Sequence, residues 1–90
     1  MFRVPRPNLI ESDQGFSVEV LGRAGLRYRE GDQIYFVDSE VVLGPSGVII
    51  YSASIRTWEP SFDVEPTKRA AIVENIREAF RFQGYEINVL

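Results

Sequence analysis

The side chains in this sequence that are best spaced for chemistry are two pairs of carboxylates. Asp38 and Glu40 alternate along one predicted strand, and Asp63 and Glu65 repeat the same spacing in a predicted loop. Paired carboxylates can divide the roles of acid and base when their surroundings separate their pKa values, and they can also bind calcium. Calcium takes about six to eight oxygen ligands, however, and acids at this spacing are frequent by chance. Neither pair by itself indicates an active site or a metal site.

The composition excludes the commoner kinds of catalytic centre. The 90-residue chain has no cysteine and no histidine, which excludes Ser-His-Asp and Cys-His nucleophilic sites, the usual zinc centres and disulfides. The glycines in residues 44–47 are not followed by a phosphate-binding lysine, and this segment predicts a hairpin turn. We therefore predict a protein that is not an enzyme and that needs no cofactor and no metal.

The acidic residues are concentrated in the middle of the chain. The net charge is −3, but residues 30–65 alone have a balance of −6, with Arg56 set against seven acids: Glu30, Asp32, Asp38, Glu40, Glu59, Asp63 and Glu65. This distribution argues against nucleic acid as a partner and favours a basic protein partner. The alternative is that these acids only keep loops and strand faces solvated.

The elements that position these acids are organised around one amphipathic helix, predicted over residues 66–84. Its apolar stripe consists of Ile72, Ile76, Ala79, Phe80 and Gln83, with Val73 at its flank. Glu74 with Arg77 and Glu78 with Arg81 can form ion pairs on the opposite side. Pro66 suits the first helical position, and Gly84 suits the left-handed residue that ends a helix.

The segments around the helix read as strands. Alternation or continuous apolar character predicts strands over residues 16–20, 26–29, 33–40, 47–54 and 85–89. Residues 33–40 are apolar on both faces at 34–37, which places that strand inside the sheet. Residues 55–58 either continue the fourth strand or bend away, and residues 59–65 form an irregular connection to the helix.

We therefore expect an α+β fold of order β-β-β-β-α-β, in which one long helix covers one face of a mostly antiparallel sheet with four to five strands. Residues 1–14, which hold two prolines, are expected to form an extended arm before a single domain over residues 15–90. The last strand can lie beside the first strand or within the middle of the sheet. The N-terminal stretch lacks the apolar core of a signal peptide, and no run reaches the length of a membrane span, so we expect a soluble cytoplasmic protein.

Three aromatic residues allow more than one interpretation. Trp58 either caps the open edge of the core or anchors a partner, because tryptophan carries much of the binding energy at interfaces. Tyr28 lies between Arg27 and Arg29 as in a strand that stacks RNA bases, but alternation points the tyrosine into the core. Phe82 falls at the flank of the helix stripe, where part of its ring is exposed.

Several short motifs follow one another along residues 25–90. They are Tyr28-x-Glu30-Gly31, then Ser39-Glu40, then Ile49-Ile50-Tyr51-x-x-Ser54-Ile55-x-x-Trp58, and finally Tyr85-Glu86-Ile87-Asn88-Val89. In order and spacing they resemble the immunity protein 74 family of bacterial polymorphic-toxin and contact-dependent inhibition systems, and the N-terminal arm lies outside the resemblance. The resemblance implies a cytoplasmic antidote that binds the toxin domain delivered by a sibling cell and blocks it without catalysis.

Combined with this resemblance, the charge distribution predicts how the partner is bound. Many such toxins are nucleases with basic clefts, and an acidic protein can occupy the place of the phosphate backbone. The residues that we expect to bind the toxin are Asp38, Glu40, Trp58, Glu59, Asp63 and Glu65. A homo-oligomeric accessory or regulatory module that pairs by its sheet edges is the main alternative, and a small carboxylate enzyme is a third. Monomer and homodimer both remain open, and neither nucleic acid nor a membrane is expected as a partner.

Overall fold

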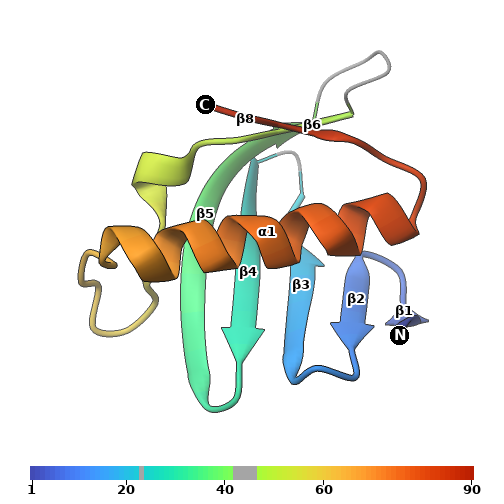
Figure 1. The fold of residues 1–90 in the computed structure, drawn as a ribbon, viewed down its shortest axis with the longest axis horizontal. Coiled ribbons are helices and arrows are strands. Elements are labelled where there is room, and N and C mark those ends of the chain that lie inside the picture. The colour runs from blue at the N-terminus through green and yellow to red at the C-terminus, as the bar shows by residue number, and fades with distance from the viewer. Residues whose placement is uncertain (23, 42–46) are drawn as a thin grey trace.

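The chain folds as one α-helix packed against one sheet. The computed structural model describes residues 1–22, 24–41 and 47–90. In these residues the elements follow one another as β1 (Phe2–Arg6), β2 (Leu9–Ser12), β3 (Phe16–Val20), β4 (Ala24–Glu30), β5 (Gln33–Val41), β6 (Val48–Ile50), the 3-10 helix η1 (Ser52–Ser54), β7 (Arg56–Thr57), α1 (Pro66–Phe82) and β8 (Ile87–Val89). The predicted α+β class with one helix on one face is confirmed (Figure 1). The sheet is larger than the predicted four to five strands.

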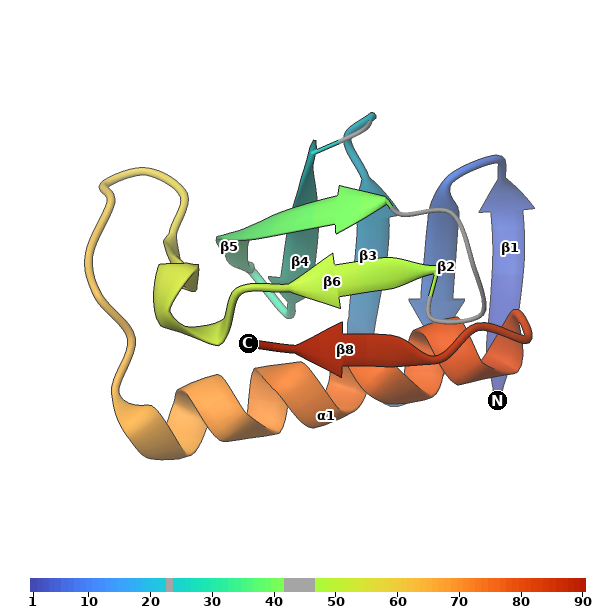
Figure 2. The same ribbon diagram turned by 90° about the horizontal axis from the view of Figure 1, so that it is seen from above.

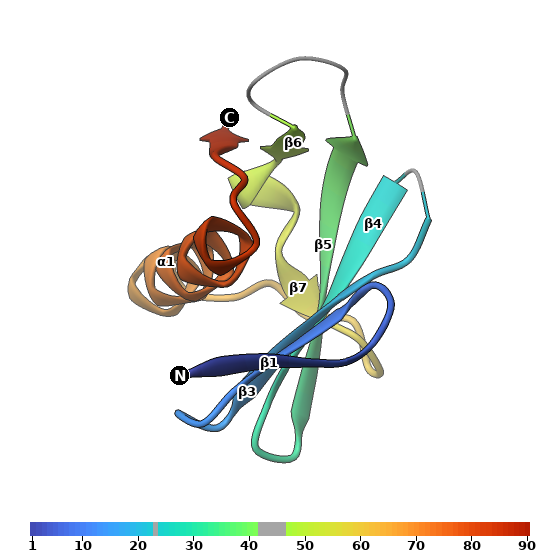
Figure 3. The same ribbon diagram turned by 90° about the vertical axis from the view of Figure 1, so that its right-hand side faces the viewer.

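The sheet curls around the helix. Its strands lie in the order β1-β2-β3-β4-β5-β6-β8, and β7 pairs with β5 beside β6. In the views of Figures 2 and 3, β6 and β8 turn over the helix while β1 to β5 form the layer behind it. The last strand therefore lies at the edge beside β6, which is neither of the two positions left open by the sequence. It runs parallel to β6 because α1 carries the chain back along the sheet between the two strands.

The N-terminal segment differs from the expected arm, because residues 2–12 form a β-hairpin that extends the sheet. Strand β2 pairs with β3, and β1 pairs with β2 as an edge strand. Asn8 has a positive φ of 69°, and together with Pro7 it makes the turn between the two strands. Ile10 is only 3% exposed. Burial of this apolar side chain against the helix side of the sheet favours the hairpin over a free arm.

The predicted helix stripe is confirmed with one exception. Ile72, Ile76 and Phe80 are buried, as are Val73 and Ala79. Gln83 is exposed, because the helix ends at Phe82 and Gln83 is its C-cap residue. Gly84 has a φ of 88°, as a left-handed helix-ending residue requires. The two expected ion pairs on the outer side of the helix, Glu74–Arg77 and Glu78–Arg81, each have an N···O distance of 3.4 Å.

Tyr28 points into the core, as alternation predicted, and its hydroxyl joins the sheet to the helix. The hydroxyl donates to Glu30 Oε1 at 2.6 Å and accepts a hydrogen bond from Asn75 Nδ2 at 2.7 Å. Burial raises the pKa of the Tyr28 hydroxyl well above its usual range. Lys68 Nζ donates to Glu30 Oε2 at 2.7 Å, and this bond lowers the pKa of the Glu30 carboxyl. The network fixes the first half of α1 over β4.

The connections differ from the predicted strands in the middle of the chain. The third predicted strand, β5, lies inside the sheet as expected, and its turn from β4 uses Gly31 with a φ of 59°. The fourth strand is shorter than residues 47–54, because the chain turns into η1 after Tyr51 and returns as β7, which pairs with β5. Of the predicted hairpin turn at 44–47, residues 44–46 lie outside the described residues. No helix in the described part of the chain is both long and apolar enough to cross a membrane.

Candidate functional site

The face of the sheet turned away from α1, here called the outer face, carries three of the residues predicted for partner binding: Asp38 and Glu40 of β5, and Trp58, which directly follows β7. Figure 3 shows this face on the side of the sheet opposite the helix. Over β1 to β4 every arginine of the outer face except Arg29 is paired with a glutamate of the same face. Arg3 pairs with Glu11 at 2.7 Å, and Glu19 pairs with both Arg6 at 2.8 Å and Arg27 at 3.0 Å. This half of the face therefore has little unsatisfied charge to offer a partner.

An aromatic–arginine cluster of Phe36, Arg56 and Trp58 occupies the outer face over β5 and β7. The rings of Phe36 and Trp58 meet edge to face with their centroids 5.7 Å apart. The Arg56 guanidinium lies over the Phe36 ring, 4.6 Å from its centroid. The backbone N–H of Trp58 donates to the Ile34 carbonyl at 2.9 Å, which continues the pairing of β7 with β5. The sheet pairing thus sets the cluster's geometry.

Trp58 does not cap the core. Its side chain is 37% exposed and lies outside the buried cluster of apolar residues between sheet and helix. Because β5 alternates, Tyr35 and Val37 face the helix and are buried, while Phe36 between them faces outward. Trp58 packs on Phe36 and so lies on the outer face too. It is placed where a partner can reach it.

Asp38 and Glu40 follow the cluster along β5, and both are exposed. The Tyr51 hydroxyl donates to Glu40 Oε1 at 3.0 Å, and this bond raises the pKa of that hydroxyl above its ordinary value. The Tyr51 backbone N–H donates to the Asp38 carbonyl at 3.0 Å, while the Asp38 N–H donates to Ser54 Oγ at 2.8 Å. These bonds hold η1 against the end of β5. The two carboxylates and the tyrosine therefore form one polar group beside the cluster.

The other three predicted acids, Glu59, Asp63 and Glu65, are exposed and lie in the β7–α1 loop (residues 58–65). Thr57 closes this loop: its N–H donates to the Phe62 carbonyl at 2.9 Å, its hydroxyl accepts from the Phe62 N–H at 2.8 Å, and the same hydroxyl donates to the Pro60 carbonyl. The backbone of Asp63 bridges that of Arg56. Glu65 is the N-cap residue of α1, where the helix dipole favours a negative charge.

The six predicted residues are therefore arranged around the aromatic–arginine cluster, but not as one continuous acidic patch. Asp38 and Glu40 lie together on one side of it, Trp58 belongs to it, and the loop acids lie beyond β7. Within the described residues, none of the five acids takes part in an ion pair. The sequence analysis missed Phe36, Arg56 and Tyr51. The alternation of β5 contained the signal for Phe36, since residues 36, 38 and 40 share one face.

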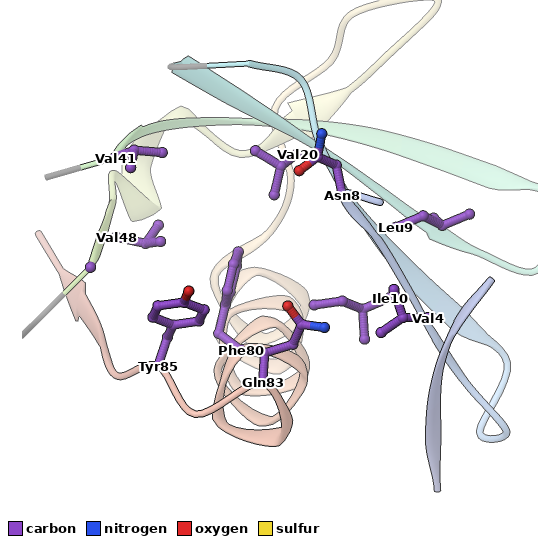
Figure 4. Close-up of a pocket in the computed structure, with 11 residues that line it drawn as sticks. Val4, Asn8, Leu9, Ile10, Val20, Val41, Val48, Phe80, Gln83 and Tyr85 are labelled. Atoms are coloured by element: carbon purple, nitrogen blue, oxygen red, sulfur yellow. The ribbon is translucent and has the colours of Figure 1, made fainter. Parts of the chain in front are cut away.

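A separate apolar groove of about 420 Å³ lies where the curled sheet meets the C-terminal end of α1 (Figure 4). Its polar groups are the Asn8 and Gln83 amides and the Tyr85 hydroxyl, and it holds none of the six predicted residues. Its lining consists of Val4, Asn8, Leu9, Ile10, Val20, Val41, Gly47, Val48, Phe80, Gln83 and Tyr85. The groove contains no carboxylate. In the described residues, potential metal ligands do not gather in groups of three or more anywhere.

Comparison with known proteins identifies the family. The family model described as immunity protein 74 matches residues 17–89, a span that runs from β3 to the end of β8 and includes all six predicted residues. Comparisons with curated proteins and with solved structures gave no match. Because the match covers most of the sequence, this chain belongs to the immunity protein 74 family.

Proposed function

We propose that this chain binds and blocks a cognate toxin domain of a bacterial polymorphic-toxin or contact-dependent inhibition system. The contact surface is the outer face over β5 and β7 together with the β7–α1 loop. Membership of an immunity protein family supports this role, and immunity proteins are in general not catalytic. The chain acts by covering the toxin rather than by modifying it.

The observation that carries the proposal is the contrast between the two halves of the outer face. Arg3, Arg6 and Arg27 are already paired with glutamates of the same face. In the described part of the chain, the acids around the aromatic–arginine cluster have no such ion-pair partner and are exposed. Unpaired surface acids attract a basic surface over a distance and speed its encounter. A nuclease toxin with a basic cleft fits this chemistry.

Trp58 supplies the short-range part of the contact. Its ring is partly exposed at the centre of the acids and is held in place by Phe36 beneath it. Tryptophan and arginine side chains held rigidly at the centre of an interface commonly carry most of its binding energy. We assign Trp58 the anchoring role and Asp38, Glu40, Glu59, Asp63 and Glu65 the steering role.

The edge strands support this proposal over a homo-oligomeric module that pairs by its sheet edges. Pro5 lies within the edge strand β1 and has no N–H to donate to an added strand. Arg3 and Arg6 place charges on the same edge strand, which further discourages pairing. The opposite edge strand, β8, has 3 residues, so it provides only a short template.

The test separates steering from anchoring. A candidate toxin domain is co-expressed in cells with the wild type or with the double variant Asp63→Lys/Glu65→Lys to measure protection. Its association with each separately purified protein is then followed by stopped-flow over a range of salt concentrations. We expect the double variant to associate more slowly and with a weaker salt dependence. Glu74→Lys/Glu78→Lys is the matched control, because it changes net charge equally on the exposed side of α1.

Two outcomes count against the proposal. Absence of both binding and protection by the wild type would reject the antidote role itself. Full protection and an unchanged association rate with a folded Asp63→Lys/Glu65→Lys variant would reject the acidic steering surface. Trp58→Ala should instead speed dissociation, by about 30-fold if Trp58 is a hot spot worth roughly 2 kcal/mol.

A further inference from the structure

Two arginines of the outer face, Arg29 and Arg56, differ from the others in having no carboxylate partner. Arg29 Nε donates to the Gly31 carbonyl at 3.2 Å, and Arg56 Nη1 donates to the Ser54 carbonyl at 3.2 Å. Among the described residues neither arginine is in an ion pair, and the residues outside that description, 23 and 42–46, include no acid. Each guanidinium has further N–H donors beyond its one bond to a backbone carbonyl.

Strand register places these two cations on either side of β5. Arg29 of β4 is paired with Ile34, and Arg56 of β7 is paired with Phe36. Ile34 and Phe36 are half-buried, and Trp58 is exposed beside them. These three side chains form an apolar surface between the two arginines, here called the apolar floor. Arg56 is itself half-buried, and its guanidinium lies over the Phe36 ring. This contact and the bond to the Ser54 carbonyl restrict the guanidinium before any partner arrives.

Such a centre is poorly suited to a partner that is basic throughout. Covering a half-buried guanidinium with a second cation removes water from both charges and opposes like charges, which costs binding energy. A carboxylate, in contrast, accepts two parallel hydrogen bonds from an oriented guanidinium. The apolar floor between the arginines can bury aliphatic or aromatic side chains that flank the carboxylate.

We propose that the toxin surface carries charges of both signs: an acidic, apolar segment of the toxin places carboxylates on Arg29 and Arg56, while basic groups around it face the acids on either side. This inference rests on the proposed function and specifies the chemistry of the partner at the centre of the contact. It makes Arg29 and Arg56 binding residues of equal standing with Trp58.

The test uses the toxin domain against which the wild-type chain protects cells. Binding of that domain to Arg29→Gln/Arg56→Gln and to Arg29→Glu/Arg56→Glu is measured by calorimetry at fixed salt. We expect the glutamine variant to bind about tenfold more weakly or worse, and the glutamate variant to bind more weakly still. Arg77→Glu, on the exposed side of α1, is the matched control and should change affinity by no more than about twofold.

Whether the arginine variants bind the toxin more weakly or more tightly tests the inference. If the toxin surface opposite the centre is basic, removal of the arginines relieves repulsion and both variants bind more tightly, which would overturn the inference. Unchanged affinity would overturn it as well. In either case the proposed function stands if the wild type protects and Asp63→Lys/Glu65→Lys binds more slowly. Circular dichroism establishes that each variant is folded, and the glutamine pair serves where the glutamate pair does not fold.

Discussion

Truncation of Trp58 is expected to leave the protein folded, in contrast to truncation of a core aromatic residue of similar size. Trp58→Ala removes an edge-to-face contact with Phe36, worth about 0.5–1.5 kcal/mol, and some half-exposed apolar area. We expect a loss of about 1–2 kcal/mol in the free energy of unfolding. Phe80 is 5% exposed and packs under the sheet, so Phe80→Ala should cost about 3–5 kcal/mol.

The two expected losses differ enough to be measured against the total free energy of unfolding. A domain of this size has a stability of about 5–13 kcal/mol by per-residue scaling. With a urea m-value of about 1.5 kcal/mol/M, Phe80→Ala should lower the urea midpoint by about 2–3 M and Trp58→Ala by about 1 M. Urea unfolding followed by far-UV circular dichroism measures both shifts. Equal midpoint shifts would mean that Trp58 belongs to the core, and its role as an exposed anchor would then be wrong.

Three further changes test the fold. Arg77→Ala should alter the free energy of unfolding by about 0.5 kcal/mol or less, because its ion pair with Glu74 is on the exposed side of α1. If urea unfolding instead shows a loss as large as that of a core residue, the side of α1 that carries Arg77 would face the sheet. Glu30→Gln should cost about 1 kcal/mol or less at pH 7, since its pair with Lys68 is partly exposed. The pKa of Glu30 is lowered in the folded state. The contribution of its carboxylate to folding stability is therefore present above the ordinary carboxyl pKa and is lost as pH falls through the lowered value. The urea midpoints of wild type and Glu30→Gln should converge in acid, and a constant difference would contradict this. Val20→Ile adds one methylene to the wall of the apolar groove and should raise Tm by about 3–6 °C in a calorimetric scan, whereas a lower Tm would mean that the space is already filled.

The sequence predicts best where one local rule decides the outcome. The helix follows from a 3.6-residue period with Pro66 at its start and Gly84 after its end, and the structure confirms each of these. Gly31 likewise marks the tight turn before β5. The sequence does not predict the β1–β2 hairpin, because two prolines in a polar N-terminal segment favour an extended arm. The Pro7-Asn8 pair is in fact a turn signal, since asparagine tolerates the positive φ that the turn needs.

Prediction from sequence fails where a contact between distant segments determines the local structure. Apolar residues predicted that the fourth strand continues to residue 54, but the Ser52 hydroxyl donates to the Leu90 carbonyl and the Ser54 hydroxyl to the Tyr51 carbonyl. These side-chain bonds compete with the sheet ladder and favour the turn into η1. The exposed acids were predictable from their type. The stacking of Arg56 on Phe36 was not, because it requires β7 to pair with β5 across an intervening strand and turn.

The proposed contact surface is organised around strand β5. It pairs with β4 along one edge, while its other edge is shared by β6 at one end and β7 at the other. Between β6 and β7 the chain turns through η1, where the Ser54 hydroxyl accepts a hydrogen bond from the backbone of Asp38. The same turn returns Arg56 and Trp58 to the side of Phe36. The glutamates that neutralise arginines on the outer face lie on β2 and β3, next to β1 and β4 and away from β7. Within the described residues, the acids around β5 and Arg56 therefore have no ion-pair partner on this chain, and the proposed toxin contact with charges of both signs rests on this.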